Sequence, residues 1–120
     1  MRKTLLLSVL ALALTGGQAS AHARLLRAAP RVGATVTQSP AELRLWFSET
    51  IEAAHSSVTL SAINGPRVPL GRLALDPKDP RVVVVPIQGS LAPGRYHVEW
   101  RMTSADTHHM DGDYFFGLKP

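Results

Sequence analysis

The 120-residue chain contains no cysteine. Without thiols it can form neither a disulfide framework nor a thiolate site for zinc, iron–sulfur clusters or blue copper, and cysteine catalysis is excluded. Charged residues make up only 18% of the sequence and hydrophobic residues 45%, which argues against disorder and allows a packed core. The length limits that core to one domain, so any function lies on the surface of a single small fold.

Clusters of positive charge are also lacking. Basic residues outnumber acidic ones by 13 to 9, but they are scattered along the chain and are not interleaved with aromatic residues, which form only 6% of it. Nucleic-acid binding needs a contiguous basic surface that follows the phosphates. The sequence shows none, so we expect no nucleic-acid partner.

Long hydrophobic runs are scarce as well. The longest, residues 5–14, is interrupted by one serine, follows an Arg-Lys pair and precedes the small residues 19–21. This order is typical of a secretory signal peptide, residues 1–21. A membrane anchor needs ~20 apolar residues, about twice this length. We therefore expect cleavage after residue 21 and an exported, soluble protein of residues 22–120 without a membrane span.

The exported part consists of short apolar segments separated by proline and glycine turns, and no helical period persists. Most segments alternate apolar and polar residues, which indicates half-buried strands. They cover residues 43–47, 58–61, 82–85, 96–102 and 114–118. The pattern predicts one all-β domain, a Greek-key β-sandwich or barrel of immunoglobulin-like type with about seven strands. Tyr96 follows Pro93-Gly94 as in the tyrosine corner of such sandwiches.

Cleavage after residue 21 would leave His22 at the N-terminus. An N-terminal histidine offers its α-amine and ring Nδ1 to one metal ion in a six-membered chelate, which no internal histidine can do. A histidine can also stand there by chance, because signal cleavage tolerates many following residues. The rest of the sequence has to decide between the two.

Asp106 and His108 lie two residues apart near the C-terminus. In extended backbone their side chains leave the same face and converge, whereas His109 points the other way. Most Asp-x-His pairs are simply solvated, but together with His22 this pair supplies an amine, two imidazoles and a carboxylate. Four such donors suit the tetragonal geometry of Cu(II), and zinc fits a planar chelate less well.

The sequence resembles the CopC family of periplasmic copper-resistance proteins, which are small β-sandwiches that bind Cu(II) through an N-terminal histidine. The resemblance extends over the exported chain. Its motifs are His22, residues 29–34, Pro40 to Glu49 with its Phe-Ser-Glu sequence, 91–96, Trp100-Arg101, 104–108 and 112–116.

The resemblance implies a role for each matching residue. His22, Asp106 and His108 match the family's Cu(II) ligands, and Glu49 matches a glutamate near that site, where it would orient an imidazole or the amine. Arg101 would neutralise nearby carboxylates. The implied protein is a periplasmic, monomeric copper carrier, buffer or donor in copper resistance or homeostasis, with a CopD-type inner-membrane copper permease as recipient.

The chain departs from the family at several positions. His109 stands where a proline often follows the ligand histidine, and the Met-rich loop that holds Cu(I) in some members is missing. We expect His55 at a strand edge, His97 solvated on the polar face of its strand and Met110 in the core or a loop. A weak Cu(I) site formed by His55, Met102 or Met110 remains open.

Two other functions compete with copper carriage. A histidine-brace copper monooxygenase also uses an N-terminal histidine, but it needs an open fourth position that Asp106 would fill. An immunoglobulin-like structural or adhesion module would carry His22 by accident, since the fold alone implies no function. We expect a protein that is not an enzyme.

Overall fold

A computed structural model describes residues 24–120 of the chain; the expected signal peptide and His22 lie outside the described residues. Regular structure in the described part is β-strand, apart from one 3₁₀ turn. The elements are β1 (Leu25–Ala29), β2 (Thr35–Val36), β3 (Glu42–Phe47), η1 (Ala53–His55), β4 (Ser57–Ala62), β5 (Ala74–Asp76), β6 (Asp79–Pro86), β7 (Gly94–Thr103) and β8 (His109–Leu118).

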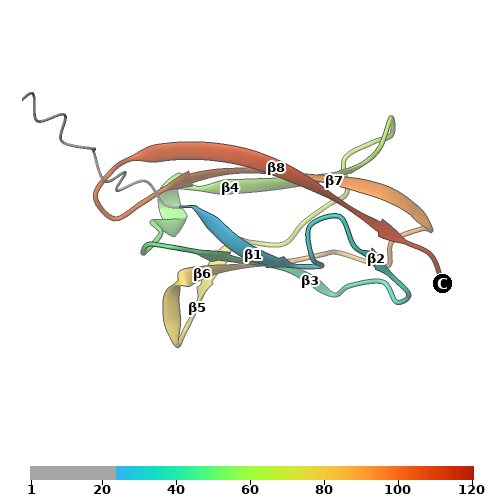
Figure 1. The fold of residues 1–120 in the computed structure, drawn as a ribbon, viewed down its shortest axis with the longest axis horizontal. Coiled ribbons are helices and arrows are strands. Elements are labelled where there is room, and N and C mark those ends of the chain that lie inside the picture. Colours follow the sequence, from blue (N-terminus) through green and yellow to red (C-terminus); the bar gives the residue numbers. More distant parts are fainter. Residues whose placement is uncertain (1–23) are drawn as a thin grey trace, which may run out of the picture.

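These strands form two stacked four-stranded sheets (Figure 1). One has the order β1-β3-β6-β5 and the other β2-β8-β7-β4. Only the β5–β6 and β7–β8 connections stay within a sheet; every other connection crosses between sheets, as in Greek-key sandwiches. The predicted all-β, immunoglobulin-like sandwich is confirmed. The described part has eight strands rather than about seven, because β2 and β5, of two and three residues, are too short to show an alternating pattern.

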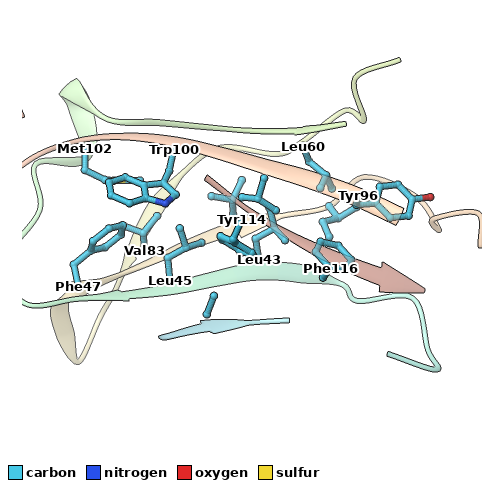
Figure 2. Packing of buried hydrophobic residues seen from close by; sticks show 14 of the residues in the cluster. Leu43, Leu45, Phe47, Leu60, Val83, Tyr96, Trp100, Met102, Tyr114 and Phe116 are labelled. Carbon is cyan, nitrogen blue, oxygen red and sulfur yellow. The ribbon is translucent and has the colours of Figure 1, made fainter. Parts of the chain in front are cut away.

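The core lies between the sheets and follows the period of two in the sequence (Figure 2). In β3, Leu43, Leu45 and Phe47 are buried, whereas Trp46 between them faces outward and is partly exposed. The inward residues of β7 pack against them from the other sheet; they are Tyr96, Val98, Trp100 and Met102. Each strand therefore has one apolar face for the core and one face for solvent or function.

The tyrosine corner is present. The hydroxyl of Tyr96 donates a hydrogen bond to the carbonyl oxygen of Ala92 at 2.5 Å, and its ring stacks on Phe116 with 5.5 Å between centroids. This closes the loop that leads into β7 and fixes where that strand begins.

The β7–β8 hairpin positions the candidate site. It pairs continuously from Gly94 opposite Leu118 to Thr103 opposite His109. The sequence pattern placed the start of the last strand at residue 114, but the strand begins five residues earlier, because residues 109–113 pair with β7 while His109, Asp111 and Asp113 face outward. Residues 104–108 are consequently a turn, at the same end of the sandwich as η1 and the start of β1 (Figure 1).

Candidate metal centre

The turn of residues 104–108 is closed by its own hydrogen bonds. The amide of buried Ser104 donates to the carbonyl of His108 at 3.0 Å, and the amide of Thr107 donates to the carbonyl of Ser104 at 2.8 Å. Thr107 has a φ of +69°, in the left-handed region that non-glycine residues rarely adopt. This conformation reverses the chain within a few residues and fixes the side chains on either side of Thr107.

Asp106 and His108 meet across this turn. His108 Nδ1 lies 2.9 Å from Asp106 Oδ2, and the two side chains are 48% and 45% exposed. The two side chains converge as predicted, but not for the predicted reason: the backbone here is a turn, not an extended strand with both side chains on one face. The turn leaves a carboxylate and an imidazole side by side, within reach of solvent.

The Asp106 carboxylate is held in its ionised form. The Ser104 hydroxyl donates to Asp106 Oδ1, and the His108 side chain lies against the other oxygen. These contacts, the Ser104 hydrogen bond first, lower the pKa of Asp106 to about 2. The group is therefore an anionic oxygen donor at every physiological pH, which a metal ion can bind without displacing a proton.

Glu49 lies beside the same turn. The amide of Ala105 donates to the carbonyl of Thr50 at 2.9 Å, which ties the turn to the end of β3. The two segments enclose a shallow hollow of about 380 Å³, here called the Glu49 hollow, which is lined by Ser48, Glu49, Thr50, Arg81, Ala105 and Asp106. Two of the predicted site residues, Glu49 and Asp106, therefore share one cavity although they are 57 positions apart in sequence.

The arginine of this hollow is Arg81, which sequence reasoning missed. Arg101, expected to neutralise nearby carboxylates, is an exposed residue of β7 that lines other hollows, one of them together with Glu99, Asp111 and Asp113. Arg81 is placed by β6, where the carbonyl of Pro80 accepts the amide of Ile51 at 3.0 Å. Its guanidinium is paired with Asp79, Nε to Oδ1 at 3.1 Å. The position of Arg81 at the hollow depends on this contact between segments that are distant in sequence, so no local sequence motif could have predicted it.

The first described residue is fastened to the rim of the Glu49 hollow. The amide of Arg24 donates to Ser48 Oγ at 2.8 Å, and the amide of Ser48 donates to the carbonyl of Arg24 at 3.0 Å. Ser48 lines the hollow next to Glu49. The chain therefore enters the described fold at the candidate site, although His22 itself lies outside the described residues.

His109 takes part in a different arrangement. The Thr103 hydroxyl donates its single proton to the carbonyl of His55 at 2.9 Å, so its oxygen accepts from His109 Nδ1, 3.0 Å away. His55 and His109 line a separate hollow of about 580 Å³. The expectation that His55 sits at a strand edge is wrong, since it ends η1. Neither histidine lines the Glu49 hollow.

His97, Met102 and Met110, which were not predicted as Cu(II) ligands, lie away from the Glu49 hollow. His97 is on the outer face of β7 as predicted, but it is not merely solvated: it stacks on Phe115 with 4.4 Å between centroids and lies 2.7 Å from Asp113. Met110 packs against the core, which confirms the expectation for it, and Met102 is fully buried.

Residues 24–120 contain no group of three or more His, Cys, Asp or Glu side chains close enough to hold a metal ion. Asp106 and His108 supply two donors, and Glu49 lies in the adjoining cavity. The third predicted ligand, His22, lies outside the described residues.

Comparison with known proteins identifies the fold. Residues 25–119 match the CopC domain. The chain belongs to the CopC family. It is 31% identical to protein YobA of Escherichia coli K12 over 113 residues, covering 94% of this chain and 91% of YobA. It is also 31% identical to the copper resistance protein C of Escherichia coli over 119 residues, covering 88% and 94% of the two chains.

Solved structures agree with the family assignment. The crystal structure of CopC from Methylosinus trichosporium OB3b superimposes with a TM-score of 0.76 at 31% identity, covering 82% of this chain and 95% of that one. Like that CopC, this protein is a two-sheet sandwich. Among residues 24–120 we find no helix long and apolar enough to cross a membrane.

Proposed function

We propose that this CopC-family protein binds one copper ion as Cu(II) at the Glu49 hollow and acts as a carrier, buffer or donor in copper resistance or homeostasis. Its relatives include proteins named copper resistance protein C, with which it shares family and fold. The single observation that carries the proposal is the Asp106–His108 contact, because Asp106 shares the Glu49 hollow with Glu49 as an ionised carboxylate and holds the His108 imidazole against its other oxygen.

The remaining donors would come from His22 through its α-amine and ring Nδ1. Arg24, fastened to Ser48 at the rim, is two residues from His22, and two residues of extended chain span about 7 Å. That reach suffices to bring an N-terminal histidine to the hollow. Amine, two imidazoles and carboxylate then form the tetragonal nitrogen and oxygen set that favours Cu(II).

The oxidation state follows from the donor types. Cu(I) prefers soft sulfur ligands, and the chain has no cysteine; Met102 and Met110 line the separate hollow of His55 and His109 and not the Glu49 hollow. Reduction of the bound ion should therefore weaken its binding. Release on reduction suits a donor better than a permanent store.

Glu49 and Arg81 complete the surroundings of the ion. Glu49 would accept a hydrogen bond from the amine or from an imidazole N–H, a contact that metal-bound histidines usually have. Arg81 also lines the hollow, but its charge is paired with Asp79, so it adds little net positive charge beside the carboxylates. In this proposal the chemistry is ligand exchange at the copper ion, and the protein acts as a carrier rather than as an enzyme.

The setting is extracytoplasmic. The expected signal peptide directs the chain to the periplasm, where it would act as a monomer and pass copper to a membrane copper permease of the CopD type. Intact-mass measurement of the exported protein, with and without Cu(II), tests both points. We expect the mass of residues 22–120 plus one copper ion; a retained residue 21, or more than one tightly bound ion, contradicts the proposal.

A further inference from the structure

Another cavity lies at the β1 edge of the β1-β3-β6-β5 sheet. It has a volume of about 500 Å³ and is here called the Arg27 groove. Strand β1 is the edge strand of its sheet, so the groove is open on that side. Its lining residues are Leu26, Arg27, Ala28, Ala29, Arg31, Val32 and Trp46. None of them is a proposed copper donor.

The groove carries the most exposed large hydrophobic side chains of residues 24–120. Leu26 is 58% and Val32 59% exposed. Leu26 is the extra residue of a β-bulge in β1, which turns it out of the regular inward and outward alternation. Single exposed apolar residues are ordinary, but here two lie in one groove and form a small apolar patch beside its arginines.

The same groove carries positive charge without a carboxylate partner. The Arg27 guanidinium lies 4.0 Å from the centre of the Trp46 ring. Neither Arg27 nor Arg31 has an ion pair within residues 24–120. Arg44 is the internal contrast: it also approaches Trp46, but Glu42 and Asp76 neutralise it at 3.0 and 2.6 Å.

We propose that the Arg27 groove binds anionic phospholipid and docks the protein on a membrane surface. The phosphate would lie between Arg27 and Arg31, and Leu26 and Val32 would enter the acyl boundary. Trp46 has the amphipathic ring that membrane interfaces favour. Addition of a partner protein's strand to β1 is disfavoured, because the bulge and the following Pro30 interrupt that edge.

The test is copper-free binding of the exported protein to vesicles of phosphatidylglycerol and phosphatidylcholine. Binding is measured by sedimentation and by tryptophan fluorescence, in which partly exposed Trp46 and not buried Trp100 would meet the lipid. Binding to phosphatidylglycerol and not to pure phosphatidylcholine is expected, with weaker binding at high salt. Arg27→Gln and Arg31→Gln should each weaken it roughly fivefold. Leu26→Ser and Val32→Ser should each weaken it about tenfold at unchanged charge.

Matched controls lie elsewhere on the surface. Arg72→Gln, near the opposite edge of the sheet, and Ile63→Ser, in the turn after β4, remove the same kinds of group outside the groove and should leave binding unchanged. The proposal would be overturned by any of three results: equal losses of binding in the control variants, no preference for phosphatidylglycerol over phosphatidylcholine, or full displacement of the protein from vesicles by low millimolar inorganic phosphate. Binding of polyglutamate at Trp46 without binding to vesicles would also overturn it and would indicate an acidic protein partner instead.

Discussion

Arg24 and Ser48 exchange two hydrogen bonds, from the amide of each residue to an oxygen of the other, at 2.8 and 3.0 Å. The contact joins the start of the described chain to the end of β3, directly before Glu49. It explains why an N-terminal residue could complete a site whose other donors lie more than 80 positions later in the sequence. The start of β1, the end of β3 and the β7–β8 turn lie at one end of the sandwich (Figure 1).

Removal of either donor of the pair should cost most of the Cu(II) affinity. We expect Asp106→Ala and His108→Ala each to weaken binding by more than ~100-fold, beyond the loss typical of outer-sphere changes. His109→Ala and His97→Ala are the matched controls, since those rings are bound to Thr103 and Asp113. Competition titration measures all four. Equal losses at His108 and His109 would refute this ligand assignment.

Glu49 is expected to accept a hydrogen bond from a copper-binding amine or imidazole rather than to bind the copper ion itself. Glu49→Gln should weaken Cu(II) binding by about 10- to 100-fold without changing the stoichiometry. Glu52→Gln, three residues further on and outside the Glu49 hollow, is the control and should have no effect. Isothermal titration calorimetry would show the difference; identical curves for Glu49→Gln and the native protein would remove Glu49 from the site.

The pH dependence of copper binding should not come from Asp106. Its pKa is lowered to about 2 from an ordinary value near ~3.9, so the stability its charge adds is present above about pH 4 and is lost as pH falls through about 2. Copper must instead displace protons from an amine, ordinarily near ~7.7–8.0, and from imidazoles near ~6.5.

Affinity should accordingly fall steeply from pH 8 to pH 5. Asp106→Asn should lower affinity at each pH but keep the same slope, as measured by Cu(II) titrations across this range. A shallower slope in Asp106→Asn would mean that the carboxylate carries a proton that copper displaces.

Much of the fold was accessible from sequence, because strands with one buried face reveal themselves by alternation. The inward residues of β3 and β7 were predicted correctly, as was the tyrosine corner at Tyr96. The short strands β2 and β5 were missed since two or three residues carry no period.

The candidate site was less accessible. Asp106 and His108 were named from their spacing, yet the spacing argument assumed a strand where a left-handed Thr107 makes a turn. Arg81 was missed because its position depends on the pairing of β6 with the segment after β3. Spacing identifies donors within one segment, whereas neighbours from other segments require the tertiary structure.

Gly112 is a packing requirement of the β7–β8 hairpin. A Cβ there would overlap Trp100 Cζ2 and lie 2.7 Å from Cε2, and Trp100 is held edge-on against Phe47 with 5.1 Å between centroids. Gly112→Ala should therefore lower the free energy of unfolding by about 1–3 kcal/mol. Gly117→Ala, whose Cβ would meet nothing closer than 3.4 Å, is the control in thermal unfolding. Equal melting temperatures for both variants would contradict this packing argument.

The central claim is that a free amine at His22 completes a Cu(II) site with Asp106 and His108. Its most direct test is a Cu(II) competition titration of the exported protein beside a form with one alanine added before His22, with circular dichroism to confirm the same fold. We expect the added residue to abolish high-affinity binding while the spectrum stays unchanged. Equal affinity of the two forms would show that the N-terminal amine is not a ligand.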